Sequence, residues 1–252
     1  MSDSTPETEP YFRVCGLETR LGKRTIFDRL DLDIHNGESV VIMGRSGEGK
    51  SVLLQHLLGL MKPNGGDIYI KGANITSYSE EELRPLRKKM GIMFQDGALF
   101  DFLTVAENVS FPLSEAGVSD EEELNEKARQ ALEMVGLAEH MNVLPMNLSG
   151  GMRKRVALAR ATVGHPDCIL CDEPTAGLDP VAAGDINELI REMVDAYRAT
   201  SVVVTHDISS MNQIADRVVM LMDGKIIFSG SPKEIHESEN VDVRDFLAGR
   251  TR

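Results

Sequence analysis

The chain has 252 residues, of which 42% are hydrophobic, and it carries a net charge of −13. This length can bury a sizeable core, as one large domain or two small ones. The acidic balance argues against a nucleic-acid partner and against a basic membrane-binding surface. No apolar run approaches the roughly 20 residues that a membrane-spanning helix needs.

The N-terminus and the cysteines limit the expected compartment. The first ten residues are polar and acidic, so we expect residues 1–10 to be a disordered tail and not a secretory signal. Three cysteines, Cys15, Cys168 and Cys171, do not make a disulfide framework, and the cytoplasm is the default. The last two have the spacing of a redox or metal motif. They lie inside an apolar stretch, however, and we favour buried small hydrophobic residues.

Hydrophobic patterns predict the secondary structure of the first third of the chain. The expected strands are 11–19, 26–34, 40–43, 67–71 and 90–94, and the expected helices are 51–60 and a short segment after Ser79. Ser79 with Glu82 resembles a capping box at the start of that short helix. The strands other than 40–43 and 90–94 favour an antiparallel sheet beside a buried strand at 40–43.

The middle of the chain, from Asp96 to about Thr162, is predicted to be helical. Ser119 with Glu122 resembles a second capping box, and Gly136 is expected to end the helix that follows. Strands and helices then alternate: strands at 168–171, 201–205, 218–222 and 225–228, and helices at 180–197 and 207–215. This alternation implies an α/β fold with a parallel sheet flanked by helices.

Residues 44–51 have the G-x-x-x-x-G-K-S pattern that predicts a phosphate-binding loop, made up of Gly44, Arg45, Ser46, Gly47, Glu48, Gly49, Lys50 and Ser51. The loop lies between a predicted strand and a predicted helix, as its chemistry requires. Glycines let backbone N–H groups surround phosphate oxygens, and the helix N-terminus adds positive potential. Lys50 is expected to reach the β- and γ-phosphates and Ser51 to hold Mg²⁺. The alternative is a glycine-rich turn with a chance GKS.

Two acidic residues and a histidine follow predicted strands at the same sheet edge. Asp172 and Glu173 end one apolar strand, and His206 ends another. The carboxyl ends of parallel strands meet beside the phosphate loop. Asp172 is therefore expected to help hold Mg²⁺, and Glu173 to accept a hydrogen bond from the attacking water, as general base or as orienter. The alternative is an acidic strand end that faces solvent.

Five further motifs, in this order, resemble those of the ATP-binding cassette (ABC) ATPases over about residues 12–230. They are Gln95 (Q-loop), the signature LSGGM at 148–152 with Ser149, Gly150 and Gly151, the Walker B segment 168–173, the D-loop AGLD ending at Asp179, and His206 (switch histidine). The resemblance implies a P-loop NTPase cassette. Its parts are a RecA-like parallel core, an antiparallel β subdomain and a helical subdomain at about 97–162.

The resemblance also implies ATP and Mg²⁺ as cofactors and a head-to-tail homodimer that holds two ATP molecules between its subunits. Gln95 would then contribute to the metal site and to catalysis, His206 would contact the γ-phosphate, and the signature residues and Asp179 would serve the nucleotide site. Independently, Ser149 opens a predicted helix, which is a second place where an anion can bind. The alternative is an ordinary capped helix. We assign no catalytic role to Arg153, Lys154 and Arg155, which we expect to contact solvent or acidic neighbours.

Three departures from the family pattern concern the nucleotide. No aromatic residue is found in 19–23, where the family stacks adenine, so Leu21 or its neighbours would make only apolar contact. Val52 replaces a common threonine and removes one hydroxyl from the site. Glu48 lies inside the phosphate loop, and we expect it to point outward because phosphates would repel its carboxylate.

Shorter segments resemble the MlaF-type ATPases of Mla/MCE lipid transport systems. They are GALFD at 97–101, the GKSV of the phosphate loop, and VRDFL at 243–247, within an expected C-terminal helical extension at 231–252. This resemblance implies a separate permease partner, a possible MCE-type substrate-binding protein, and a place on the cytoplasmic face of the inner membrane. Phe100 and Phe102 are candidates for a permease-docking surface. The rivals are a non-transport cassette, such as an iron–sulfur assembly ATPase, and a nucleotide-gated scaffold.

Overall fold

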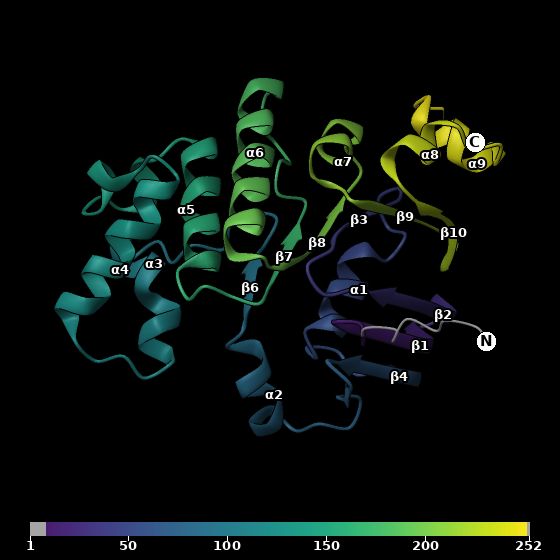
Figure 1. The fold of residues 1–252 in the computed structure, drawn as a ribbon, viewed down its shortest axis with the longest axis horizontal. Helices are drawn as coiled ribbons and strands as arrows, with labels where there is room; N and C mark the ends of the chain where they lie inside the picture. Colours follow the sequence, from purple (N-terminus) through teal and green to yellow (C-terminus); the bar gives the residue numbers. More distant parts are fainter. Residues whose placement is uncertain (1–8, 251–252) are drawn as a thin grey trace, which may run out of the picture.

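The computed structural model describes residues 9–250 (Figure 1). Most of the tail predicted at 1–10 therefore lies outside the described residues. Within the described range, no helix is both long and apolar enough to cross a membrane.

A largely parallel sheet forms the centre of the molecule. In residues 9–250 it has six strands in the order β10-β9-β3-β8-β7-β6. All neighbours are parallel except β10, which is antiparallel to β9. The strands are β3 (Ser39–Met43), β6 (Met90–Met93), β7 (Cys168–Asp172), β8 (Thr200–Thr205), β9 (Arg217–Met222) and β10 (Lys225–Gly230). β3 and β8 are buried throughout, which explains why they are continuous apolar runs and do not alternate.

A smaller antiparallel sheet lies beside the phosphate-loop side of the central sheet (Figure 1). Its order is β2-β1-β4-β5, counting the part of the chain that the structure describes. The strands are β1 (Phe12–Leu21), β2 (Arg24–Ile34), β4 (Gly65–Ile70) and β5 (Ala73–Asn74). In β2, Leu32 and Ile34 are buried whereas Asp31 is exposed, so one face packs and the other meets solvent. The predicted antiparallel sheet is confirmed.

Helices cover the faces of the central sheet and lie beyond both of its edges (Figure 1). They are α1 (Lys50–Leu57), α2 (Glu80–Arg87), α3 (Val105–Glu115), α4 (Glu121–Met134), α5 (Gly150–Thr162), α6 (Pro180–Tyr197), α7 (Ile208–Ile214), α8 (Pro232–His236) and α9 (Val241–Leu247). α3, α4 and α5 pack on one another at one end, and α8 and α9 lie at the other, beside β9 and β10 (Figure 1). The division of the chain at 97–162 and at 231–252 stays a prediction.

Two expected helix boundaries differ from the structure. The capping box at Ser79 is confirmed, but the one at Ser119 is wrong, because the carboxylate of Asp120 accepts the N–H of Glu122 at 2.9 Å. A carboxylate at this position also interacts favourably with the helix dipole, so the helix begins one residue later. The first helix ends at Leu57 instead of residue 60, because Gly59 adopts a left-handed backbone conformation with φ +65°.

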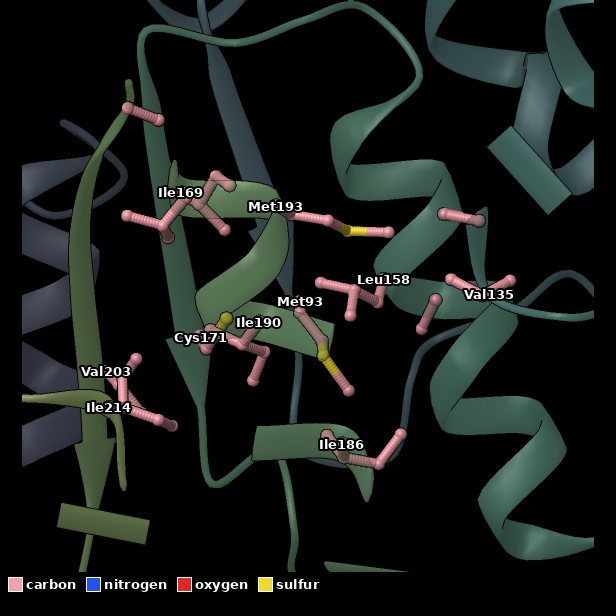
Figure 2. Close-up of a cluster of buried hydrophobic side chains, with 14 of the residues drawn as sticks. Met93, Val135, Leu158, Ile169, Cys171, Ile186, Ile190, Met193, Val203 and Ile214 are labelled. Atoms are coloured by element: carbon pink, nitrogen blue, oxygen red, sulfur yellow. The ribbon is translucent and has the colours of Figure 1, made fainter. Parts of the chain in front are cut away.

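Buried side chains form two clusters, one on each face of the central sheet. Val41 of β3 belongs to one cluster and Val40 to the other, since successive strand residues point to opposite faces. Figure 2 shows the first cluster, in which Leu158 of α5 and Ile190 of α6 point toward β7. The cluster fixes α5 and α6 against the strand that ends at Asp172.

The two cysteines of β7 follow the same rule. Cys168 and Cys171 are fully buried free thiols that belong to different clusters, on opposite faces of the sheet. Burial raises the pKa of Cys171 to about 12, so its thiol stays protonated and packs as a small apolar group. The interpretation as buried hydrophobic residues is confirmed.

Candidate active site

The phosphate loop connects β3 to α1, as predicted. Gly47 and Gly49 have φ of +85° and +97°, a region that residues with a side chain rarely adopt. At Gly49 a Cβ would also lie 2.6 Å from a methyl group of Ile26. Glycine at 49 is therefore required both by the turn and by the close approach of β2.

Lys50 is the first residue of α1, and only 6% of its side chain is exposed. Its ammonium donates to the carbonyls of Gly44 at 2.8 Å and Arg45 at 3.1 Å. It also lies 3.5 Å from a carboxylate oxygen of Glu173. The protein itself therefore satisfies this buried cation with oxygens, in the place where phosphate oxygens are expected.

The acidic residue of the loop does not face that place. The Glu48 carboxylate accepts the backbone N–H of Asp223 at 2.7 Å, in the turn between β9 and β10. The contact draws the side chain out of the loop. This agrees with the expectation that Glu48 avoids phosphates, although it binds a turn and does not simply enter solvent.

Ser51 and Asp172 place two oxygens side by side. The Ser51 hydroxyl donates to Asp172 at 3.0 Å. Burial raises the pKa of Asp172, and the neighbouring charge of Glu173 adds to this, whereas the Ser51 hydrogen bond opposes it. A hydroxyl and a carboxylate are oxygen donors of the kind that Mg²⁺ takes together with phosphate and water. In the described part of the chain no group of three His, Cys, Asp or Glu side chains could hold a metal alone.

Glu173 follows β7 with a backbone φ of +45°, uncommon for a residue with a side chain. Its N–H donates to the carbonyl of Val204 on the adjacent β8 at 2.9 Å. The Thr205 hydroxyl donates to its carboxylate at 3.1 Å, and His206 Nδ1 lies 3.0 Å from both carboxylate oxygens. Since a carboxylate only accepts, Nδ1 carries the hydrogen. The carboxylate is thus held by Thr205 at the end of β8, by His206 directly after it, and by Lys50.

These groups line an open pocket of ≈ 1010 Å³. Most of the predicted site residues lie on its wall: Arg45, Ser46, Gly47, Gly49, Lys50, Ser51, Val52, Gln95, Glu173 and His206. Gly44 and Asp172 contact that wall through Lys50 and Ser51. The structure therefore brings together the phosphate loop and the residues predicted at the ends of β6, β7 and β8.

Besides Gly44, Glu48 and Asp172, four further predicted residues do not line this pocket. Ser149, Gly150 and Gly151 form the start of α5, where the Ser149 hydroxyl accepts the N–H of Met152 at 3.2 Å. Asp179 caps α6 in the same way, accepting the N–H groups of Val181 and Ala182. Ser149, Gly150 and Asp179 are exposed. Within one chain, the exposed start of α5 is a separate surface.

The pocket also has walls that the sequence analysis did not anticipate. Residues 246–250 line it, and the Arg45 guanidinium donates to the carbonyl of Arg250 at 3.0 Å. No sequence signal links segments two hundred residues apart. Leu21 is 45% exposed and outside the pocket, whereas the apolar residues Ile26, Val52 and Ile208 line it.

Lys154 corrects another expectation. Arg155 does pair with an acidic residue, Asp185, at 2.9 Å. Lys154, however, is only 6% exposed, and its ammonium donates to the carbonyls of Gln95 and Glu173. A lysine on the same helix face as Ala157 and Ala161 was a signal for this, because a cation on an apolar face needs buried oxygen partners.

Comparisons with known proteins agree with this geometry. The family model described as "ABC transporter" matches residues 27–176. The chain is 39% identical to the intermembrane phospholipid transport ATP-binding protein MlaF of Haemophilus influenzae, over 94% of this chain and 90% of that protein. It is 40% identical to "Probable ribonucleotide transport ATP-binding protein mkl" of Mycobacterium leprae, over 94% of this chain and 68% of that protein.

Solved structures give the same answer. The dimeric cassette MJ0796, in a post-hydrolysis state bound to ADP and Pi, superposes with a TM-score of 0.81 at 34% identity, covering 88% of this chain and 98% of that one. The cassette cbiO1 of Clostridium perfringens, part of the ABC transporter complex cbiONQ, superposes with a TM-score of 0.82 at 32% identity, covering 95% of both. The chain therefore belongs to the ATP-binding cassette proteins of ABC transporters, and it is an ATPase of that family.

Proposed function

We propose that the residues converging on the pocket divide the work of ATP hydrolysis among them. Lys50 and the backbone of the phosphate loop bind the phosphates, and Glu173 orients the attacking water. His206 and Thr205 keep the Glu173 carboxylate in place. When Mg²⁺ is bound it neutralises phosphate charge, and Ser51, Asp172 and Gln95 would hold it.

The carboxylate of Glu173 is the observation that carries this proposal. It contacts the phosphate-loop lysine, at 3.5 Å, and the histidine after β8, at 3.0 Å, in one cluster. A phosphate entering at Lys50 would therefore arrive beside a fixed carboxylate, and a water between the two would be held in place by it. Substitution of Glu173, developed in the Discussion, tests this assignment.

We further propose that two chains associate so that the start of α5 in one completes the pocket of the other. Ser149 and Gly150 are exposed at the N-terminus of a 13-residue helix, which favours a bound anion. The solved structure of MJ0796 with ADP and Pi is dimeric, which supports the association of two chains. Asp179 caps α6 near this surface and would contribute to it. Sedimentation of the Glu173→Gln variant with and without MgATP tests this: an ATP-dependent dimer is expected, and a monomer under both conditions contradicts it.

The transport function that we propose is the energising of lipid movement across a bacterial envelope. The chain would act with a separate permease and an MCE-type protein, at the cytoplasmic face of the inner membrane. The match to MlaF of Haemophilus influenzae supports this, because it extends over 90% of that protein. The GALFD and VRDFL segments support it too.

A second candidate cargo is a ribonucleotide, because the similarity to the mkl protein is as high, at 40% identity. One experiment separates the two. The chain is captured with its permease from detergent-solubilised membranes, and the bound material is analysed for phospholipid and for nucleotides other than ATP and ADP. The lipid proposal predicts enriched phospholipid. Enrichment of a ribonucleotide without lipid would make the ribonucleotide the favoured cargo. Capture of no permease would contradict both proposals.

A further inference from the structure

Lys154 is a buried cation that the assigned roles leave without a purpose. It lies on α5, four residues after the first signature glycine, Gly150. Its ammonium donates to the main-chain carbonyl of Gln95 and to that of Glu173, the latter at 3.3 Å. These two acceptors belong to the residue proposed at the Mg²⁺ site and to the residue proposed to orient water.

Energetics argue that this contact is more than incidental packing. Burial lowers the pKa of Lys154, and the nearby charge of Asp96 opposes that effect. An apolar side chain of the same length would avoid the cost of removing an ammonium from water. Instead the ammonium joins two segments, the turn after β6 and the end of β7, just beyond Met93 and Cys171, where the backbone pairing of these two strands ends.

Arg160 shows that α5 anchors the same turn at a second point. Its buried guanidinium donates to the carbonyls of Gly97 at 2.5 Å and Ala98 at 2.7 Å. Both residues have left-handed backbone conformations, with φ of +76° and +46°. Side chains of α5 thus hydrogen-bond to both ends of the turn 95–98, and of these Lys154 is the one nearer the pocket.

We propose that Lys154 is a positioning residue for hydrolysis, which fixes the main chain of Gln95 relative to that of Glu173. Its side chain does not line the pocket. It sets the separation between the metal-holding side chain and the water-orienting side chain, and it ties both to the helix that begins with Ser149. This inference rests on the roles proposed above for Gln95 and Glu173.

The test compares three variants of the full chain. Lys154→Met keeps length and apolar volume and removes every donor. Lys154→Gln keeps two N–H donors and removes the charge. Arg155→Met is the matched control, since it removes a cation from the same helix that points to Val135 and Asp185, away from the pocket. Each is measured for kcat, for MgATP dissociation constant, for the Mg²⁺ concentration that gives half-maximal rate, and for the thermal midpoint.

Lys154→Met is expected to lower kcat by about 10- to 100-fold, because small misplacement of positioned groups costs this much. Its ATP affinity should change by less than about threefold, since Lys50 and the phosphate loop are untouched, while its Mg²⁺ requirement rises. Lys154→Gln should recover most of kcat, because two donors suffice for two carbonyls. Arg155→Met should keep kcat and the Mg²⁺ requirement.

Two results would overturn the proposal. One is a Lys154→Met protein with wild-type kcat and Mg²⁺ requirement. The other is a parallel fall of kcat, ATP affinity and thermal midpoint in both Lys154 variants, which would make the contact a stability element. If Glu173→Gln hydrolyses ATP normally, the proposed function fails instead, and this result is distinct from either of the two.

Discussion

Replacing Glu173 by glutamine keeps the shape of the side chain and removes its charge. One carboxylate oxygen accepts from Thr205 and His206, and the other faces Lys50 at 3.5 Å. A carboxamide has one oxygen, so its best orientation satisfies the donors of Thr205 and His206 and turns its NH₂ group toward Lys50. The resting site then loses an ion pair, whereas the ATP-bound site, in which phosphate takes Lys50, does not.

Glu173→Gln is therefore expected to leave ATP binding equal or tighter and to slow turnover. A charge-assisted contact is worth about 1.5–3 kcal/mol, so losing it from the resting site leaves ATP affinity equal or tighter, by up to about 10- to 100-fold. Loss of the group that orients water lowers kcat by about 100-fold or more, or about 2.7 kcal/mol. Phosphate release measures the rate, and titration with a fluorescent ATP analogue measures the affinity. Wild-type turnover, or a joint loss of rate and affinity, would refute this reasoning.

Three further predictions concern binding, docking and pH. Lys50→Ala should abolish tight MgATP binding, because phosphate meets this ammonium directly, and an unchanged titration would show that the loop is only a turn. Phe102 is 79% exposed, so Phe102→Asp should keep near-normal basal ATPase activity and lose co-purification with the permease. Phe100 packs against the rings of Phe102 and Phe111, so Phe100→Asp should lower stability instead. If Phe102→Asp still co-purifies with the permease, docking takes place elsewhere. His56 Nε2 lies 2.8 Å from Thr19 Oγ1, and burial lowers the pKa of this histidine in the folded state. Because the unfolded chain takes up the proton first, the stability contributed by neutral His56 is complete above about pH 6.5 and declines as the pH falls below that value. Denaturant titrations at several pH values should show a steeper acid loss for wild type than for His56→Gln, and equal slopes would contradict the assignment.

Much of the fold could be predicted because its signals are local. The apolar run at 40–43 followed by glycines and Lys50 fixes a strand, a loop and a helix within twenty residues. The pair Asp172 and Glu173 could be placed at the same edge as His206, since parallel strands end together. Their meeting at one edge followed from topology, whereas the direct contacts of Glu173 with Lys50 and His206 were not among the expectations.

The rest depends on contacts that no local pattern encodes. No residue pattern near Arg45 predicts that its guanidinium donates to the carbonyl of Arg250. The choice between Ser119 and Asp120 as a cap depends on one residue of register, where two good capping residues compete. The partners of Lys154 are main-chain carbonyls, which every residue carries, so no residue type marks them.

The two buried lysines of the site show how one geometry separates binding from turnover. In the chain alone, Lys50 rests on two carbonyls of its own loop and on Glu173, all of which phosphate oxygens can replace. Lys154 rests on the carbonyls of Gln95 and Glu173, which remain its acceptors whatever fills the pocket. Lys50 is thus a cation that exchanges partners when ATP enters, and Lys154 one that keeps them. Substitution of the first should therefore appear in the dissociation constant, and substitution of the second in kcat.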